Sequence, residues 1–182
     1  GSYATRRCSV GTSGLTHGLG WAVNLSRLDS NGTVPNDNYR NQAAFLSLDY
    51  HRSPRRQLNF HFYGNANDAG APGPYGSDPA HNFYGIDTIS RSKQNLFSFN
   101  GSYAEQVSPR FRQVTTVGVG KNDYYFRSPW GDAFSDNLRG SFNTRSEITV
   151  STRDFLVFGF EYNREQYMGT YVADASFKPF LL

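Results

Sequence analysis

The feature that most constrains this chain is an alternation of apolar and polar residues with a period of two. In the segment 19–27, large apolar residues occupy positions 19, 21, 23 and 25, and small or polar residues occupy the even positions. The segments 58–65, 97–103, 115–120 and 156–163 repeat this pattern. Successive side chains of a strand point to opposite faces, so the pattern predicts strands with one apolar and one polar face.

We therefore predict an all-β chain of about eight antiparallel strands, because helical periodicity is hard to find. Their expected ranges are 2–12, 18–29, 40–52, 56–66, 93–106, 111–122, 138–151 and 154–166. The expected connections alternate in length. Those at one end are short, at 12–17, 53–55, 107–110 and 151–153, and those at the other end are long, at 30–39, 67–92 and 122–137. This alternation is typical of an up-and-down transmembrane β-barrel, which has short periplasmic turns and long extracellular loops.

The composition agrees with strands that face lipid on one side. Aromatic residues make up 16% of the chain, yet the mean hydropathy is −0.60, and there is no apolar run near the ~20 residues that a membrane helix needs. The residues expected to face lipid are Leu58, Phe60, Phe62, Phe97, Phe99, Leu156, Phe158 and Phe160. Rings near the strand ends, at Trp21, Tyr50, Tyr103 and Tyr162, fit an interfacial aromatic belt.

Several functional classes are disfavoured by what the sequence contains. The net charge is only +3 and the basic residues are scattered, so we expect no nucleic-acid partner. Cys8 is the only cysteine, which excludes an intrachain disulfide and a CxxC motif. An enzyme is disfavoured, because Glu147, Glu161 and Glu165 have no identifiable catalytic partner and the histidines show no ligand spacing.

An aromatic strand at 19–25 ends in Ser-Arg-Leu-Asp-Ser-Asn-Gly at 26–32, and after a polar loop a Tyr-Arg-Asn strand entry follows at 39–41. With this pattern, the chain resembles the barrel of TonB-dependent outer-membrane receptors, including the cobalamin and ferric-siderophore groups. The next hairpin, 46–60, turns at a Ser-Pro pair and is similar to the following hairpin of the family. The segment 72–76 also has the character of that region.

The resemblance implies that residues 1–182 form part of an outer-membrane barrel of 22 strands. The plug and the remaining strands would lie outside the chain, and so would the segment that contacts TonB. The expected function is uptake of a scarce nutrient, such as a ferric siderophore or cobalamin, energised by TonB in the full-length protein. The expected partners are outer-membrane lipid and the small-molecule nutrient, and the expected location is the bacterial outer membrane.

We expect the loops 67–92 and 122–137 to bind the ligand, because both combine aromatic residues with Gly and Pro. The candidate contacts are Tyr75, Phe83, Tyr84, Tyr124, Tyr125, Phe126 and Trp130. A calcium site is an alternative role for the oxygen donors Asp29, Asn31, Asp37, Asn38 and Asp68. Turn formation by Asn and Asp is the favoured interpretation of these residues, so we predict no metal and no cofactor.

A complete small eight-stranded barrel with a structural or adhesion role is the alternative, since eight strands can close. The weak first strand and the long tail after the eighth strand argue against it. The inward-facing residues include many small or polar ones, which suits a wide, wet lumen.

Overall fold

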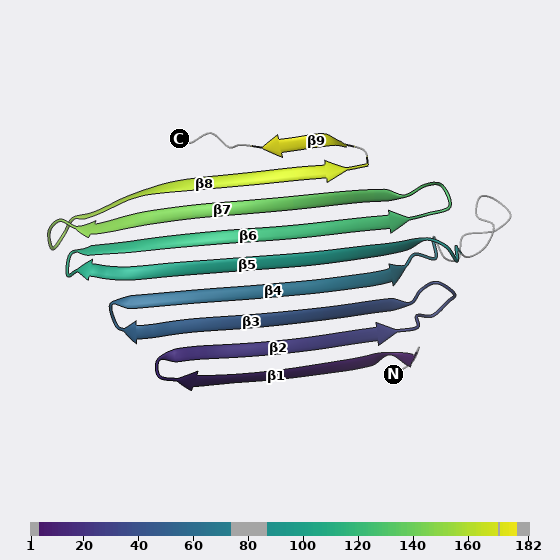
Figure 1. Ribbon diagram of the computed structural model, residues 1–182, viewed down its shortest axis with the longest axis horizontal. Helices are drawn as coiled ribbons and strands as arrows, with labels where there is room; N and C mark the ends of the chain where they lie inside the picture. The colour runs from purple at the N-terminus through teal and green to yellow at the C-terminus, as the bar shows by residue number, and fades with distance from the viewer. Residues whose placement is uncertain (1–3, 74–86, 171, 178–182) are drawn as a thin grey trace.

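The structure is a computed structural model that describes residues 4–73, 87–170 and 172–177. It consists of a single antiparallel sheet of nine strands in sequence order (Figure 1). The strands are β1 (Arg6–Thr16), β2 (Leu19–Ser30), β3 (Tyr39–Ser53), β4 (Arg56–Gly70), β5 (Arg91–Ser108), β6 (Phe111–Arg127), β7 (Ala133–Thr149), β8 (Phe155–Gly169) and β9 (Val172–Phe177). The predicted all-β, up-and-down topology is confirmed. In these ranges we find no helix with the length and apolarity needed to cross a membrane.

All eight predicted strands form, but several of their boundaries were wrong. The first strand continues to Thr16, and the turn that follows consists of His17 and Gly18, which both adopt positive φ angles of 47° and 80°. Two-residue turns of this kind match the twist of a hairpin. A ninth strand, β9, pairs with β8 where a loop was expected.

The largest correction concerns 122–137, which was predicted to be a long loop. β6 extends to Arg127 and β7 begins at Ala133, so the connection is only 128–132. Both faces of the two strands mix polar and aromatic residues in this region, so period two disappears from the sequence although the ladder continues. The expected long connections are therefore found between β2 and β3 and between β4 and β5, but not between β6 and β7 or between β8 and β9.

The register places all eight residues that were expected to face lipid on one face of the sheet. Residues opposite each other in an antiparallel ladder share a face, and Phe62 lies opposite both Leu46 and Phe99. At the centre of the sheet, one row crosses seven strands on this face: Trp21, Leu48, Phe60, Gly101, Val117, Phe142 and Tyr162. We call this the apolar face.

The other face, the polar face, carries mainly Asn and Ser, together with Gly, Ala and Tyr. Its side chains bond across the strands, as in the pairs Asn59–Ser102 and Ser47–His61, at 3.2 and 3.1 Å. None of the described large hydrophobic residues is buried. The apolar side chains touch one another within their face, where the rings of Phe62 and Phe99 lie 4.8 Å apart, but no second layer in the described part of the chain covers them.

The apolar band runs obliquely across the strands. The row of residues that face one another across the strands from Ala44 includes the apolar Phe97 on β5. Further along, the same row includes the polar residues Lys121 on β6 and Gln166 on β8. On the turn side, the row that contains Arg56 and Glu105 meets Phe158 on β8. The band thus shifts toward the turns from β3 to β8, and the turns are staggered in the same direction (Figure 1).

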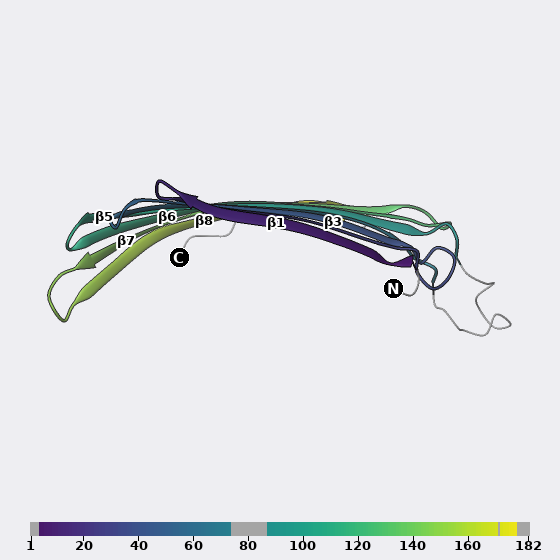
Figure 2. The ribbon, with the colours of Figure 1, turned by 90° about the horizontal axis from the view of Figure 1, so that it is seen from below.

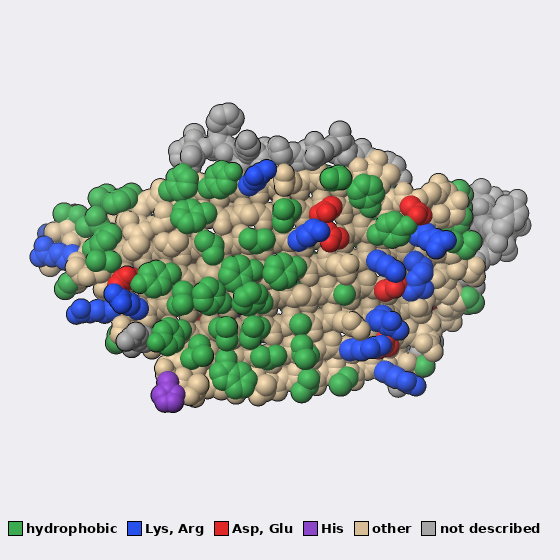
Figure 3. All heavy atoms as spheres, viewed as in Figure 1, with side chains coloured by type: hydrophobic (Ala, Val, Ile, Leu, Met, Phe, Trp, Pro, Cys, Tyr) green, Lys and Arg blue, Asp and Glu red, His purple; other side chains and the backbone are tan. Residues whose placement is uncertain are grey.

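The strands bow toward the viewer of Figure 1, so that the facing side is the convex one, at the top of Figure 2. Figure 3 shows that this convex side carries the apolar band. Charged side chains border the band at the loop end of the sheet, where β2 is joined to β3 and β4 to β5. Fewer charged side chains border it at the turn end, where β1 is joined to β2 and β3 to β4. The polar face is therefore the concave one.

Candidate functional site

The polar face has a groove of about 430 Å³ between β4 and β7. It lies over Ser98 and Gly120, two small residues opposite each other in the ladder. A Cβ added at Gly120 would meet only the carbonyl oxygen of Phe97, at 3.9 Å, so the space above this glycine is open. The larger side chains around it are Tyr63, Leu96, Asn122, Asn137 and Arg139. The groove is within the size range of small-molecule sites.

Two of the groove's amides are held in place by neighbours on the same face. Gln94 Nε2 donates to Asn122 Oδ1 over 2.9 Å, and Asn137 Nδ2 donates to Glu165 Oε1 over 2.8 Å. These bonds restrict the rotamers of Asn122 and Asn137, which lowers the entropic cost of ordering them around a ligand. The groove thus combines an aromatic ring, an apolar side chain, oriented amides and the exposed guanidinium of Arg139. Such a surface can bind a polar small molecule that carries anionic or carbonyl oxygens.

The structure separates the aromatic residues that were expected to act together. Tyr124 and Phe126 lie on the polar face of β6, on the loop side of Asn122. Tyr125 lies on the apolar face, where its hydroxyl donates to Asp132. Trp130 is in the connection 128–132 with 88% of its surface exposed. Of these four, only Tyr124 and Phe126 share a face with the groove.

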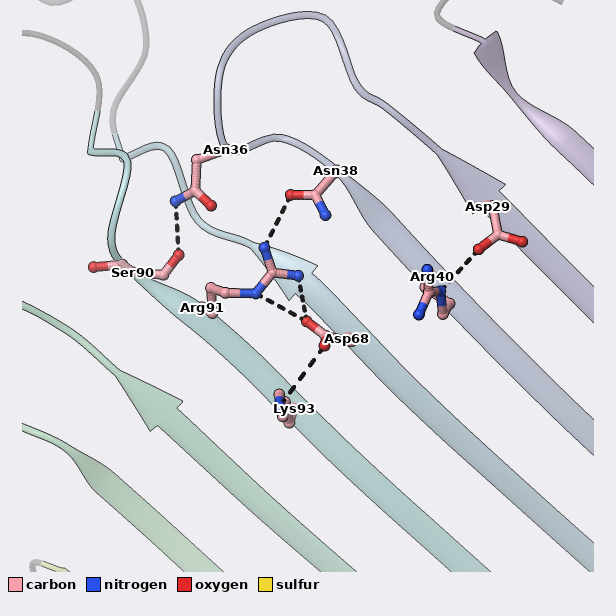
Figure 4. Close-up of polar contacts among 8 residues, drawn as sticks. All are labelled: Asp29, Asn36, Asn38, Arg40, Asp68, Ser90, Arg91 and Lys93. Atoms are coloured by element: carbon pink, nitrogen blue, oxygen red, sulfur yellow. Dashed lines mark hydrogen bonds and ion pairs between the residues drawn. The ribbon is translucent and has the colours of Figure 1, made fainter.

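The other predicted contacts, Tyr75, Phe83 and Tyr84, lie outside the described residues. The residues on both sides of 74–86 are described, and they form hydrogen bonds with the loop 31–38 (Figure 4). Asn36 Nδ2 donates to the carbonyl oxygens of Asp87 and Ser90, at 2.9 and 2.7 Å. The amide of Gly70 donates to the Asn38 carbonyl over 2.9 Å. The two connections therefore share one base at the loop end.

Gly70 is required at this base because the two connections approach closely. A Cβ added to Gly70 would lie 2.0 Å from the carbonyl oxygen of Asn36. Asn36 itself has a φ of 62°, a left-handed conformation that Asn tolerates better than most residues.

Ion pairs complete the loop end of the sheet. Arg91 donates to Asp68 through Nε over 3.1 Å and to Asn38 Oδ1 through Nη1 over 3.1 Å (Figure 4). Lys93 lies 3.9 Å from Asp68 on the other side. A cavity of about 140 Å³ beside these groups is lined by Asp29, Arg40, Asp68 and Arg91 among others. It is smaller than the usual range for ligand sites, and its charges balance.

Four of the five candidate calcium ligands, Asp29, Asp37, Asn38 and Asp68, have other partners here. Asp29 pairs with Arg27 and Arg40, at 2.5 and 2.9 Å. Asp37 accepts from the backbone amide and the hydroxyl of Thr33, both at 3.0 Å, which is the turn-forming role that the sequence favoured.

Two loop carboxylates are stabilised in their charged form. Hydrogen bonds from the backbone amide and hydroxyl of Thr33 lower the pKa of Asp37. The hydroxyl and amide of Ser90, and the amide of Ile89, lower the pKa of Asp87. Both acceptors therefore stay ionised at neutral pH and hold their turns.

Sequence reasoning missed the groove residues Asn122, Asn137 and Arg139 and also Gln94, which holds Asn122 in place. No local motif marks them, because they come from three strands and meet only through the register. Of the glutamates weighed for catalysis, Glu147 pairs with Arg112 and Arg145 at 3.1 and 2.9 Å. Glu165 supports Asn137.

No protein-family model and no curated protein matches this chain.

Proposed function

We propose that the chain forms part of the wall of an outer-membrane β-barrel receptor that takes up a scarce nutrient, such as a ferric siderophore or cobalamin. The observation that carries this proposal is the oblique apolar band on the convex face, with charged borders at both ends of the strands. Strands of an outer-membrane barrel tilt by about 35–45°. A band parallel to the membrane then crosses successive strands at shifted positions, as it does here.

The concave polar face supports the receptor function. In a barrel with lipid outside, this face borders the lumen, and the groove over Gly120 opens onto it. Tyr124 and Phe126 lie between the groove and the loop end. A ligand captured by the loops would meet these rings first and the amides of the groove next.

Transport requires parts that this chain does not supply. In the proposed mechanism, the wall excludes lipid and the loop end binds the nutrient, while release inward depends on a plug coupled to TonB. The chain would meet TonB only through those other regions. Its own residues bind and orient the ligand and break no bond.

Strand pairing favours this proposal over a closed eight-stranded barrel. Closure at eight strands would place β1 beside β8, whereas β8 pairs with β7 and β9. In the described sheet, β1 pairs only with β2. An open sheet of this kind suits a segment of a wider barrel.

Membrane embedding is tested by fluorescence quenching in the full-length protein. Trp21 lies in the apolar band, whereas Trp130 lies in the connection 128–132. The fluorescence of each tryptophan is the difference between the parent protein and the variant that lacks it, Trp21→Phe or Trp130→Phe. Lipids brominated in the acyl chains should quench the fluorescence of Trp21 and should not quench that of Trp130. Equal access of both residues to an aqueous quencher would contradict a lipid-facing band.

Ligand uptake is tested separately in cells that carry the full-length protein. Gly120→Leu fills the groove on the polar face, and Gly140→Leu adds the same side chain on the apolar face, where an added Cβ meets nothing within 4 Å. We expect Gly120→Leu to reduce uptake of iron-loaded siderophores or cobalamin, and Gly140→Leu to leave it unchanged. Uptake that is absent for every nutrient, with TonB present, would overturn the receptor function.

A further inference from the structure

The apolar face has a groove of its own over β3 and β4, with a volume of about 540 Å³. Its floor consists of the small residues Ala44, Gly64 and Ala66. Leu25 borders it on β2, and Phe97 lies opposite Gly64 on β5. A Cβ added at Gly64 would meet nothing within 4 Å, so the groove is open above this residue. An unbranched hydrocarbon chain has the shape and polarity to fill it.

Cations gather at the loop end of this groove. Arg27 lines it, and the row that contains Arg40 crosses the sheet just beyond it. In this corner, the apolar face carries the cations Arg6, Arg27, Arg40, Arg91 and Lys93. It carries the carboxylates Asp29 and Asp68. Figure 3 shows this blue cluster at the loop end, beside the apolar band. Cations therefore outnumber carboxylates here.

The cluster keeps a net positive charge after its ion pairs are counted. Asp29 is shared by Arg27 and Arg40, so one carboxylate offsets two guanidinium groups. The side chains of these two arginines are 51% and 60% exposed. Arg40 contacts Asp29 through Nε. A planar guanidinium has five N–H donors in a fork that matches phosphate oxygens.

We propose that this groove and Arg27 and Arg40 bind one phosphorylated lipid of the surrounding bilayer, with an acyl chain over Gly64 and the phosphate at the two arginines. The inference rests on the proposed function, because it requires the apolar face to be in the membrane. Ala44 and Arg40 are separated by about 13 Å along the strand. Their spacing places one in the hydrocarbon and the other near the headgroups, where arginine extends its charged end.

A second copy of this chain is a poorer occupant of the same surface. In a twofold dimer the same patch meets itself. Arg27 and Arg40 would then face the partner's identical excess of positive charge, which costs binding energy. A phosphate supplies the opposite charge instead.

The test uses the full-length protein in nanodiscs of dioleoylphosphatidylcholine. Dioleoylphosphatidic acid is titrated in, dioleoylglycerol serves as the phosphate-free lipid of the same chains, and bound lipid is counted by native mass spectrometry. We expect phosphatidic acid to be retained over dioleoylglycerol. Arg40→Gln should lower this retention about tenfold, as expected for the loss of one charge-assisted contact.

Two matched variants locate the site. Arg56→Gln removes an arginine of similar exposure on the same face at the turn end, where Arg56 pairs with Glu105, and it should leave retention unchanged. Gly64→Leu should reduce retention, whereas Gly140→Leu should not. Circular dichroism identifies any variant that fails to fold. If Gly64→Leu fails to fold, the comparison of Arg40→Gln with Arg56→Gln decides the result.

The outcomes separate this inference from the proposed function. If brominated lipid quenches Trp21 but Arg40→Gln and Arg56→Gln retain phosphatidic acid equally, the lipid site is wrong and membrane embedding stands. If Trp21 is not quenched, both fall. If Gly64→Leu abolishes a dimer without affecting lipid, the groove is an interface between copies, which also overturns the lipid site.

Discussion

The side-chain amide of Asn36 donates to the carbonyl oxygen of Ser90 over 2.7 Å and so joins two connections that are distant in the sequence. The same amide also donates to the carbonyl of Asp87 over 2.9 Å. Both bonds fix residues that follow 74–86, where the predicted contacts Tyr75 and Tyr84 lie in the sequence. The base of this connection is thus ordered before any ligand arrives, which lowers the entropic cost of binding.

Replacing Asn36 should loosen this base without unfolding the sheet. Asn36→Ala removes both hydrogen bonds and puts Ala at a positive φ, which together should cost about 1–3 kcal/mol of local stability. Asn36→Gly loses the bonds but keeps the backbone conformation, so its cost should be smaller. Hydrogen exchange at the amides of Ala71 and Asp87, which donate to Ser90 and Pro72, measures the effect. Asn31→Ala in the same loop is the control, and equal exchange in both variants would contradict the prediction.

The strand order and the two faces could be predicted from the sequence, because period two is a local signal. It is strongest where one side of the sheet is apolar, as in 58–62 and 156–160. It fails at 122–137, where β6 and β7 pair Asp123 with Asp136 and polar residues occupy both faces. Backbone hydrogen bonds continue there without any contrast between the faces, so a loop was predicted where strands occur.

The groove could not be predicted, because it depends on register. Tyr63, Gly120 and Arg139 come from three strands and align only once the pairing of β4 to β7 is known. A shift of one residue in any of these pairs would move a side chain to the other face. For the same reason, the sequence could not separate Tyr125 from its neighbours Tyr124 and Phe126.

Acid should release the turn held by Asp87. Its carboxylate accepts from the hydroxyl of Ser90 and from the amides of Ser90 and Ile89, the two amides at 2.9 and 2.7 Å, and these bonds lower its pKa in the folded state. A lowered folded pKa means that the stabilisation is complete above the unfolded value of ~3.9 and is lost as the pH falls through the folded value. Protection of the two amides, corrected for intrinsic exchange, should therefore be constant from about pH 7 to about pH 5 and should decrease in stronger acid. In Asp87→Asn the protection should be lower at neutral pH and show no acid step, and an unchanged profile would contradict this role.

Charge on the apolar face should be costly only in a bilayer. Phe60→Arg and Phe158→Arg each place a guanidinium in the apolar band, and we expect a loss of ~2–4 kcal/mol in the free energy of unfolding from vesicles. Asn100→Arg puts the same charge on the polar face of β5, where water is available, so it should cost far less. Urea titrations of the three variants in vesicles provide the comparison. If all three unfold at the same urea concentration, the faces are assigned incorrectly or the protein does not insert.

The last prediction concerns the rings of β6 and the connection that follows. Tyr124 and Phe126 share the polar face with the groove, whereas Tyr125 points to the apolar face and donates its hydroxyl to Asp132. Loss of a ring that stacks on a ligand removes a large contact area, so Tyr124→Ala and Phe126→Ala should weaken nutrient binding about tenfold each. Tyr125→Ala should leave binding unchanged and affect only the stability of the connection 128–132.

Equilibrium binding of the transported nutrient to the full-length protein in detergent measures these effects, and urea titration measures stability in parallel. Trp130→Ala is the informative fourth variant, because Trp130 is 88% exposed and lies beyond the strand end. If the ligand first meets the connections, Trp130→Ala should slow association and leave dissociation unchanged, since the ring would act before the ligand reaches the groove. Equal losses in all four variants would mean that these rings form one surface in the liganded protein, and the division between the two faces would then not govern recognition.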